Sequence, residues 1–381
     1  MSEGRGGQTD MRSIRIIHAA DLHLDSPFEA LSAAKAAVRR GEQRTLLARL
    51  SDLASREGAD LMLLSGDLLD SSNSFYETGE ELVCSLGNAP CPVFIAPGNH
   101  DFYTERSPYA KLKLPDNVYI FHENTVRFVA VPSADARVYG AAFTDRASPA
   151  LLRGFHAERR PGVYNLLCMH GEVGSPASPY NPISEEDLAA SGIDYAALGH
   201  IHKASGLRKS GNCHYSWPGC PEGRGFDEDG EKTVNIVELS GEDCLLRTAS
   251  ISGRRYFKLS LDITGKDPLL LIHTSLPDDT VRDIYRITLT GETENTPDLR
   301  TLYQNLDEMF FSLQLRDETR MKQDLWETTG DDSLRGLFLT KLRAQYDAAQ
   351  DDAQRFRVEQ AARWGLAALN RAEEVVIHDN P

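Results

Sequence analysis

The sequence is poor in cysteine, and the spacing of its cysteines excludes one kind of metal site. The chain of 381 residues has six of them: Cys84, Cys91, Cys168, Cys213, Cys220 and Cys244. None belongs to a C-x-x-C pair, so we expect no cysteine-based structural zinc site. Scattered free thiols suit a reducing compartment, in which disulfides are rare, and we therefore expect a cytoplasmic protein.

Long apolar runs are missing as well. No stretch approaches the roughly 18–20 apolar residues that a membrane-spanning helix needs. Residues 1–10 are polar, and no apolar segment follows them, so we expect neither a secretory signal nor a membrane span. We interpret residues 1–10 as a disordered tail.

Positive charge is also scarce. The chain has 41 Lys and Arg against 57 Asp and Glu, which gives a net charge of −16 at pH 7. This balance disfavours a protein that coats nucleic acid, because such binding depends on basic side chains that neutralise phosphates. It does not exclude a nuclease with a local positive centre. The sequence has no G-x-x-x-x-G-K-[ST] loop, so any ATPase activity would have to come from a partner chain.

What the sequence does have is an alternation of apolar and helical patterns. Short apolar runs end in turns rich in glycine and polar groups within five segments: 14–20, 59–70, 92–101, 164–172 and 194–202. Between the first two, residues 28–57 have the pattern of one helix, or of a helix pair broken near Gly41. Strands that alternate with helices favour an α/β layered core, in which ligands gather at the carboxyl ends of the strands.

The length of the chain predicts two or three domains. We expect a first domain over 11–251 and a second, smaller α/β domain over 252–325, with helices near 278–284 and 297–309. In the last segment, 326–381, apolar residues recur every three or four positions, which predicts two helices over 331–376.

Polar side chains follow five of the apolar strands. We identify seven plausible metal ligands: Asp21, His23, Asp67, Asn99, His170, His200 and His202. Residues two apart lie on one face of a strand, so Asp21 and His23 can share an ion, as can His200 and His202. Carboxylate, imidazole and amide ligands suit Mn²⁺, Fe or Zn²⁺. Each of these motifs alone is ordinary turn chemistry, but five in this order favour a metal centre.

Seven ligands are enough for two ions if Asp67 is shared. Two divalent ions would bring a charge of about +4 and the carboxylates of Asp21 and Asp67 about −2, so the centre would keep about +2. Such a centre attracts an anionic substrate even in an acidic chain. Paired metals stabilise the attacking and leaving oxygens of a displacement at phosphorus, which points to phosphoester hydrolysis.

The order and spacing of these motifs, over about residues 11–250, resemble the calcineurin-like metallophosphoesterase superfamily. Within it, HAADLHLDSPF (18–28) and SWPGCPEGRGFDEDGEK (216–232) are similar to the bacterial DNA-repair exonuclease branch of SbcD-related and YhaO-like proteins. The resemblance implies a four-layer β-sandwich flanked by helices as the catalytic domain. It also implies a small α/β capping domain at 252–325 and C-terminal helices at 326–381 that dock on a coiled-coil ATPase.

The resemblance assigns each ligand to a metal. The first metal would be held by Asp21, His23 and His202. The second would be held by Asn99, His170 and His200, with Asp67 bridging the two ions. Mn²⁺ is the expected ion, with Fe or Zn²⁺ as alternatives.

The resemblance also implies two catalytic residues. His100 would stabilise charge near the scissile phosphate or donate a proton to the leaving oxygen, and Asp101 would orient His100. Archaeal and eukaryotic relatives carry a second histidine where this chain has Asp70, so we do not expect a mechanism with two histidines.

The function that these features imply is a metal-dependent phosphodiesterase or nuclease acting on DNA ends or unpaired DNA. It would contact the DNA backbone and not the base sequence, and it would act in end processing or repair with an SMC/SbcC-like ATPase, with a homodimer also compatible. Two alternatives stay open. One is a phosphodiesterase or phosphatase for nucleotides or other small phosphoesters, and the other is a mainly non-catalytic DNA-end sensor or scaffold.

Overall fold

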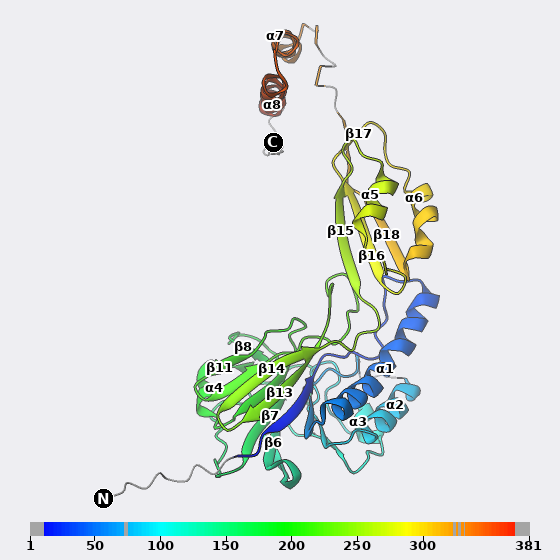
Figure 1. The fold of residues 1–381 in the computed structure, drawn as a ribbon. Coiled ribbons are helices and arrows are strands. Elements are labelled where there is room, and N and C mark those ends of the chain that lie inside the picture. Colours follow the sequence, from blue (N-terminus) through cyan, green and yellow to red (C-terminus); the bar gives the residue numbers. More distant parts are fainter. Residues whose placement is uncertain (1–10, 72–74, 323–324, 327–328, 331, 370–381) are drawn as a thin grey trace, which may run out of the picture. The chain divides into compact units, whose positions relative to one another are not determined.

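The computed structural model describes residues 11–71, 75–322, 325–326, 329–330 and 332–369 (Figure 1). The expected tail at 1–10 and the end of the expected C-terminal helices, from 370, lie outside the described residues. The chain divides into two compact units. The first comprises Met1–Leu259, Leu276–Ile287 and Thr301–Leu315, and the second Ser260–Ser275, Thr288–Arg300 and Arg316–Pro381. The expected domain boundaries at 251 and 325 stay predictions.

The first unit contains two six-stranded sheets. One has the order β14-β13-β1-β2-β3-β4, from the strands β1 (Ile14–Ala19), β2 (Leu61–Leu64), β3 (Val93–Ile95), β4 (Val118–Ile120), β13 (Val234–Ser240) and β14 (Asp243–Ala249). Strands β1 to β4 are parallel, and β13 and β14 pair antiparallel at one edge. The carboxyl ends of β1, β2 and β3 therefore meet at one end of this sheet.

The other sheet has the order β11-β12-β10-β7-β6-β5. Its strands are β5 (Arg127–Val131), β6 (Ala136–Gly140), β7 (Tyr164–His170), β10 (Tyr195–Gly199), β11 (Arg208–Ser210) and β12 (Cys213–Ser216). The four central strands are parallel, and antiparallel strands close both edges. A small parallel ribbon of β8 (Glu172–Val173) and β9 (Pro182–Ile183) follows β7.

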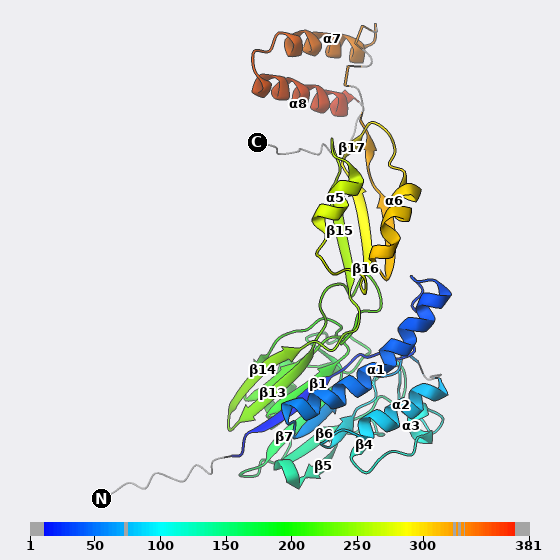
Figure 2. The same ribbon diagram turned by 45° about the vertical axis from the view of Figure 1, so that its right-hand side comes forward.

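Figures 1 and 2 show the two sheets facing each other, with helices on the outside. These helices are α1 (Ala33–Glu57), α2 (Tyr76–Gly87), α3 (Pro108–Lys111), α4 (Glu185–Ala190) and the 3₁₀ turn η1 (Pro132–Ala134). The unit also includes most of α6 (Leu299–Leu306) and the 3₁₀ turn η2 (Asp307–Met309). On β1, Ile14 and Ile16 pack between the sheets, whereas Ile17 and Ala19 pack with α1 and α2. The helix layer, the two sheets and the α4 layer form the expected four-layer sandwich.

Helix α1 passes through Gly41 without a break, so the alternative of two helices is wrong. Ser32 caps its first turn by accepting a hydrogen bond from the backbone N–H of Lys35. Beyond Gly41, buried leucines such as Leu46 and Leu50 pack against the sheet. A single glycine lowers helix stability by only about 1 kcal/mol, which this packing outweighs.

After residue 255 the chain forms a three-stranded sheet in the order β15-β16-β18, with β15 (Tyr256–Asp262), β16 (Ile284–Thr290) and β18 (Ser312–Asp317). Helices α5 (Pro268–Ser275) and α6 (Leu299–Leu306) and the ribbon of β17 (Glu292–Thr293) with β19 (Arg320–Met321) accompany it. The expected helix near 278–284 is wrong. The helix lies ten residues earlier because Asp267 caps it, accepting from the backbone N–H of Leu270, and proline occupies its first position.

The two C-terminal helices, α7 (Leu334–Asp347) and α8 (Asp352–Leu369), confirm the helical pattern. Leu339 of α7 packs against Ala362 and Leu366 of α8, so the helices pair with each other. Within the described ranges, no helix combines the length and the apolar character that crossing a bilayer requires.

Candidate metal centre

The expected motifs come together where β1, β2 and β3 of one sheet and β7 and β10 of the other end. Backbone hydrogen bonds join the first two loops, from N–H of Asp21 to Gly66 O (3.0 Å) and from N–H of His23 to Asp67 O (2.9 Å). The carboxylate of Asp21 accepts from the backbone N–H of His200 at 3.1 Å, which links the two sheets. Segments far apart in the sequence therefore meet in one centre.

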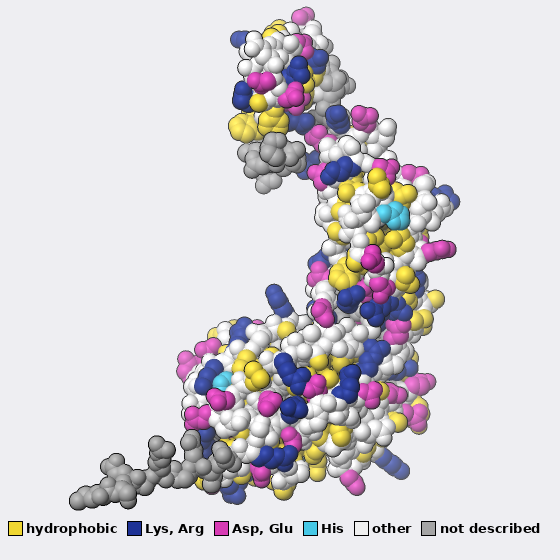
Figure 3. All heavy atoms as spheres, viewed as in Figure 1, with side chains coloured by type: hydrophobic (Ala, Val, Ile, Leu, Met, Phe, Trp, Pro, Cys, Tyr) yellow, Lys and Arg dark blue, Asp and Glu magenta, His cyan; other side chains and the backbone are white. Residues whose placement is uncertain are grey.

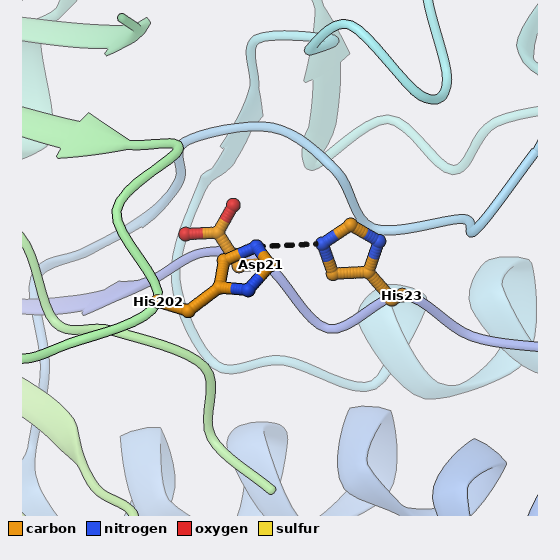
Figure 4. Close-up of side chains that lie close together, drawn as sticks. All are labelled: Asp21, His23 and His202. Atoms are coloured by element: carbon orange, nitrogen blue, oxygen red, sulfur yellow. Dashed lines mark hydrogen bonds between the residues drawn. The ribbon is translucent and has the colours of Figure 1, made fainter. Parts of the chain in front are cut away.

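The first pocket consists of Asp21, His23 and His202, whose ligand atoms lie within 4.8 Å of one another (Figure 4). The Nε2 atoms of His23 and His202 face each other at 3.1 Å. The Nδ1 atom of His202 lies 2.7 Å from a carboxylate oxygen of Glu228 and 3.1 Å from Nη2 of Arg224. A carboxylate only accepts, so the shorter contact is a hydrogen bond when Nδ1 carries a proton. The lone pair of Nε2 then points into the pocket, which is the arrangement that a cation stabilises.

The second pocket is formed by Asn99 and His170. The Nδ1–H of His170 donates to the backbone carbonyl of Ser65 at 2.9 Å, so its Nε2 carries a lone pair. This nitrogen faces Oδ1 of Asn99 at 2.9 Å and Oδ2 of Asp67 at 3.5 Å. The three atoms are all acceptors with no proton between them, and a metal ion would satisfy all of them.

Asp67 lies between the two pockets. The same carboxylate oxygen, Oδ2, is 3.8 Å from Nε2 of His23 and 3.5 Å from Nε2 of His170. Its other oxygen, Oδ1, accepts from the backbone N–H of His100 at 2.9 Å. The carboxylate is thereby fixed in an orientation that suits a shared ligand, although the bridging role itself stays a prediction.

His200 is the expected ligand whose position at the edge of the centre supports its role least. Its ring centroid is 5.2 Å from that of His170 and 5.0 Å from that of Tyr180. Among the described residues, the carboxylate and imidazole groups that cluster within 4.8 Å of one another do not include His200. Its ring borders the second pocket, and its role as a ligand stays a prediction.

Burial sets the charge state of the centre. It lowers the pKa of His23, His170 and His200 to about 4 each, so these imidazoles are neutral at pH 7 and offer lone pairs. Burial, together with the negative charge of Asp67, raises the pKa of Asp21 well above its usual range. A divalent cation would relieve the repulsion between these two carboxylates, so the residues present fit a metal centre.

The backbone of the centre is strained. Four residues have positive φ values of 44° to 99°: Asp21, His23, Asp67 and His200. Such conformations cost on the order of 1–3 kcal/mol each and persist only when the surroundings impose them. One such restraint is Gln43, which is fully buried and donates to the carbonyls of Leu22 and His23 at 2.9 Å.

Glycines allow the loops to approach this closely. A Cβ atom on Gly199 would lie 1.9 Å from the carbonyl oxygen of Ser65, and one on Gly98 would lie 2.3 Å from Oδ1 of Asp67. Both distances are far below van der Waals contact, so no other residue fits at either position without moving the Ser65 backbone or the Asp67 side chain. The glycines beside the ligands therefore determine the geometry of the centre.

The partners of Asp101 lie in the loops around His100, and the structure records no hydrogen bond between Asp101 and the ring of His100. The buried carboxylate of Asp101 accepts from the hydroxyl of Tyr109 and from four backbone N–H groups: Asp67, Leu68, Leu69 and Gly98. A buried carboxylate needs several donors, and the two loops supply them. The exposed ring of His100 instead has its Nδ1 atom 3.0 Å from the backbone oxygen of Asp70. Asp101 thus fixes the loops on either side of His100, and its role in orienting His100 stays a prediction.

The sequence did not reveal two residues of the centre, Arg224 and Glu228. Both contact His202 from the loop after β12, at 3.1 Å and 2.7 Å from its Nδ1 atom. Although burial raises the pKa of Glu228, its hydrogen bonds with His202 and Arg224 hold it well below its usual range. The only sequence signal was the resemblance of 216–232 to one branch of the family, because glycine and charge alone indicate a surface loop.

Comparison with known proteins gives related sequences for most of the chain. It is 28% identical over 265 residues to "Uncharacterized metallophosphoesterase YhaO" of Bacillus subtilis, which covers 67% of this chain and 64% of that protein. It is also similar to two proteins named "DNA double-strand break repair protein Mre11". The one from Aeropyrum pernix is 21% identical over 271 residues (65% of this chain), and the one from Saccharolobus solfataricus 25% over 256 residues (63% of this chain). The matches span 64% of the length of each of these relatives.

Two solved structures also align with the chain. TT1561 of Thermus thermophilus aligns with a TM-score of 0.38 and 12% identity, over 62% of this chain and 99% of that one. A dimetal phosphatase from Danio rerio aligns with a TM-score of 0.39 and 12% identity, over 62% and 98%. The profile of the calcineurin-like phosphoesterases matches residues 14–204, which is half of the chain. These residues include β1, β2, β3, β7 and β10 and all seven candidate ligands, and the chain belongs to the calcineurin-like phosphoesterase family.

Proposed function

We propose that this chain hydrolyses phosphodiester bonds in DNA, at ends or in unpaired segments. Its family implies a metal-dependent phosphoesterase with two divalent ions. The observation that carries the proposal is that Oδ2 of Asp67 lies between the two pockets, within 4 Å of a histidine of each. The Mre11 relatives, whose name refers to repair of DNA double-strand breaks, support DNA as the substrate. We propose Mn²⁺ as the physiological ion, since the ligands are carboxylate, imidazole and amide groups.

When bound, the two ions would supply a nucleophile at neutral pH and positive charge for the phosphoryl oxygens. The protein holds the ligands in place through Asp67 and the loops that Asp101 fixes. His100 is exposed beside His23, with ring centroids 4.7 Å apart. Its Nδ1 atom is engaged by the carbonyl of Asp70, so Nε2 remains to stabilise charge on the substrate or to give a proton to the leaving oxygen.

The distribution of charge on the surface is consistent with DNA binding only at the metal centre. Figure 3 shows Lys and Arg interspersed with Asp and Glu on the visible face of the first unit, without a continuous basic field. With a net charge of −16, attraction of DNA would depend on the metal centre and nearby basic groups. Contacts of this kind recognise the sugar-phosphate backbone and carry no direct sequence information.

We also propose that the C-terminal helices dock on an SMC-like ATPase. Helices α7 and α8 bury one apolar seam against each other, yet they expose further large apolar side chains: Leu334, Leu337, Phe356, Trp364 and Leu369. Exposed apolar residues on a helix pair suit recognition by another helix. The chain has no phosphate-binding loop of its own, so ATP dependence would come from that partner.

The proposal is tested with the purified chain on labelled single-stranded and double-stranded DNA and on bis-p-nitrophenyl phosphate, with Mn²⁺, Mg²⁺ or a chelator. We expect Mn²⁺-dependent cleavage of DNA and of the small diester, and none with the chelator or in Asp67→Asn. Hydrolysis of the small diester without cleavage of any DNA, alone or with the ATPase, would support the small-phosphoester alternative. Metal binding without hydrolysis of either substrate would support a DNA-end sensor.

A further inference from the structure

A buried carboxylate lies directly behind the metal-facing histidine of the first pocket. Oε1 of Glu228 is 2.7 Å from Nδ1 of His202, and the Glu228 side chain is 6% exposed. Arg224 holds this carboxylate with two groups, Nε at 3.2 Å from Oε2 and Nη2 at 2.6 Å from Oε1. Nη2 of Arg224 also lies 3.1 Å from Nδ1 of His202, but a guanidinium only donates and its Nη2 makes the shorter contact with Glu228. The ion pair therefore fixes Glu228 in place, and the closest partner of Nδ1 is the carboxylate at 2.7 Å.

The same guanidinium reaches the second histidine of this pocket through Asp70. Nη1 of Arg224 is 3.3 Å from Oδ1 of Asp70, and this oxygen is also 3.3 Å from Nδ1 of His23. The contact between His23 and Asp70 is electrostatic, since Nδ1 of His23 has no partner in hydrogen-bond geometry. Asp70, Arg224 and Glu228, which we call the Arg224 network, thus contact both imidazoles at Nδ1, while the two Nε2 atoms face each other in the pocket.

The chemistry of imidazole explains what such a network does. A neutral imidazole carries its proton on either nitrogen, and only the unprotonated nitrogen can bind a metal. A carboxylate at Nδ1 keeps the proton there and leaves the lone pair on Nε2, while also fixing the plane of the ring. In the second pocket, the carbonyl of Ser65 does this for His170. In the first pocket, Glu228 does it for His202.

The loop that carries the network is anchored independently at its other end. Glu222, two residues before Arg224, is paired with Arg39 of α1, and both side chains are almost completely buried. Oε2 of Glu222 also accepts from the backbone N–H of Gly253 at 3.0 Å. Glu222 makes no described contact with a histidine of the centre. It therefore offers a matched control, a buried, Arg-paired glutamate in the same loop.

We infer that Glu228 and Arg224 are positioning residues of the first pocket, which fix the tautomer and ring orientation of His202 and, through Asp70, face His23. They set the affinity of the first pocket for a divalent ion without acting on the second. The inference rests on metal binding, which the family implies, and not on DNA as the substrate. It therefore holds or fails independently of the proposed nuclease activity.

The test is calorimetric titration of the metal-free full-length chain with Mn²⁺. His202→Ala and Asn99→Ala first identify which of the two binding events belongs to which pocket. Glu228→Ala should then weaken the first-pocket event by about 10–100-fold, as loss of an outer partner of a metal ligand does, and leave the other event unchanged. Arg224→Met should weaken the same event, and Glu222→Gln should weaken neither.

A double-mutant cycle distinguishes a positioning role of Glu228 from a general loss of folded structure. In the His202→Ala background, Glu228→Ala should cause no further loss of Mn²⁺ affinity, because its effect passes through His202. Nitrogen-15 NMR of the histidines should show Nδ1–H for His202 in the parent chain and a tautomer mixture in the variant. If Glu228→Ala does not fold, Glu228→Gln replaces it and should weaken the same event by a smaller factor. Equal weakening of both events, or the same loss in Glu222→Gln, would overturn the inference.

Discussion

The imidazole of His170 and the backbone carbonyl of Ser65 share a hydrogen bond of 2.9 Å that decides which ring nitrogen can bind a metal. A carbonyl only accepts, so the proton of His170 stays on Nδ1 and Nε2 is left as an acceptor. That nitrogen points at Oδ1 of Asn99 and Oδ2 of Asp67. A cluster of acceptors without a donor is unfavourable in a buried site, and this defines the centre as a place for a cation.

The first prediction concerns the shared carboxylate. Asp67→Asn should reduce binding of both ions, because Oδ2 of Asp67 faces a histidine of each pocket. The asparagine keeps an oxygen for the backbone N–H of His100, so the loop should remain folded. Metal analysis after dialysis against Mn²⁺ measures the result. Full occupancy by two ions in the variant would show that Asp67 is not shared.

An experiment can distinguish a catalytic role of His100 from a role as a metal ligand. His100→Ala should retain two ions and reduce the rate of diester hydrolysis by roughly 10²–10⁴, as expected for a general acid. The exposed His122, which contacts Glu123 and Tyr103, gives a matched control, and His122→Ala should leave both quantities unchanged. Because ligand atoms of His100, His23 and Asp67 lie within 4.8 Å of one another, loss of an ion in His100→Ala would instead identify His100 as a ligand.

The buried carboxylate of Asp101 should contribute strongly to the stability of the fold. Asp101→Ala would leave backbone N–H groups of two loops without an acceptor, and each unsatisfied buried donor costs about 1–3 kcal/mol. We expect a loss of several such increments in the free energy of unfolding, measured by urea titration. Tyr109→Phe, which removes a single donor to the same carboxylate, should cost only about 0.5–1.5 kcal/mol. Equal losses in the two variants would contradict this role of Asp101.

The core histidine His18 should make the protein sensitive to acid. Its Nδ1 atom is 2.8 Å from the hydroxyl of Tyr195, and burial lowers its pKa to about 3 although the carbonyl of Leu198 partly offsets this. In the unfolded chain its pKa is about 6.5. Between these values only the unfolded state takes up the proton, so the contribution of His18 to stability is complete above pH 6.5 and is lost as the pH falls. The slope for one such group is about 1.4 kcal/mol per pH unit.

The measurement compares His18→Gln with the parent chain, both kept metal-free with a chelator. Urea unfolding at pH 7, 6, 5 and 4.5 gives the free energy of unfolding at each pH. The variant should lose stability less steeply on acidification, by about one proton's slope, whatever its stability at pH 7. Parallel curves for the two proteins would mean that His18 becomes protonated in the folded state as readily as in the unfolded one.

Much of the fold and the centre could be predicted from the sequence, for a physical reason. Buried parallel strands appear as short apolar runs, and the polar residues that follow them, such as Asp21 and Asp67, must lie at the carboxyl ends. The features that could not be predicted from the sequence depend on tertiary contacts. Glu228 lies in a loop whose composition resembles any exposed turn, and only the fold brings it to His202. The packing of α1 likewise overrides the weak helix propensity of Gly41.

The last prediction concerns the exposed apolar side chains of the C-terminal helices. Leu337 of α7 and Trp364 of α8 are 61% and 49% exposed, whereas Leu339 and Ala362 fill the seam between the helices. Leu337→Glu and Trp364→Glu should therefore leave the melting temperature and the hydrolysis of a small diester unchanged, because they remove no buried contact between α7 and α8. If these helices dock on a coiled-coil ATPase, each variant should weaken binding to an SMC-like ATPase from the same cell, measured by calorimetry, and abolish any ATP-dependent stimulation of cleavage. Leu270→Glu on α5, where the side chain is 65% exposed, is the control that should bind normally. Unchanged binding by both helix variants, or a matching loss in Leu270→Glu, would place the docking surface elsewhere on the chain.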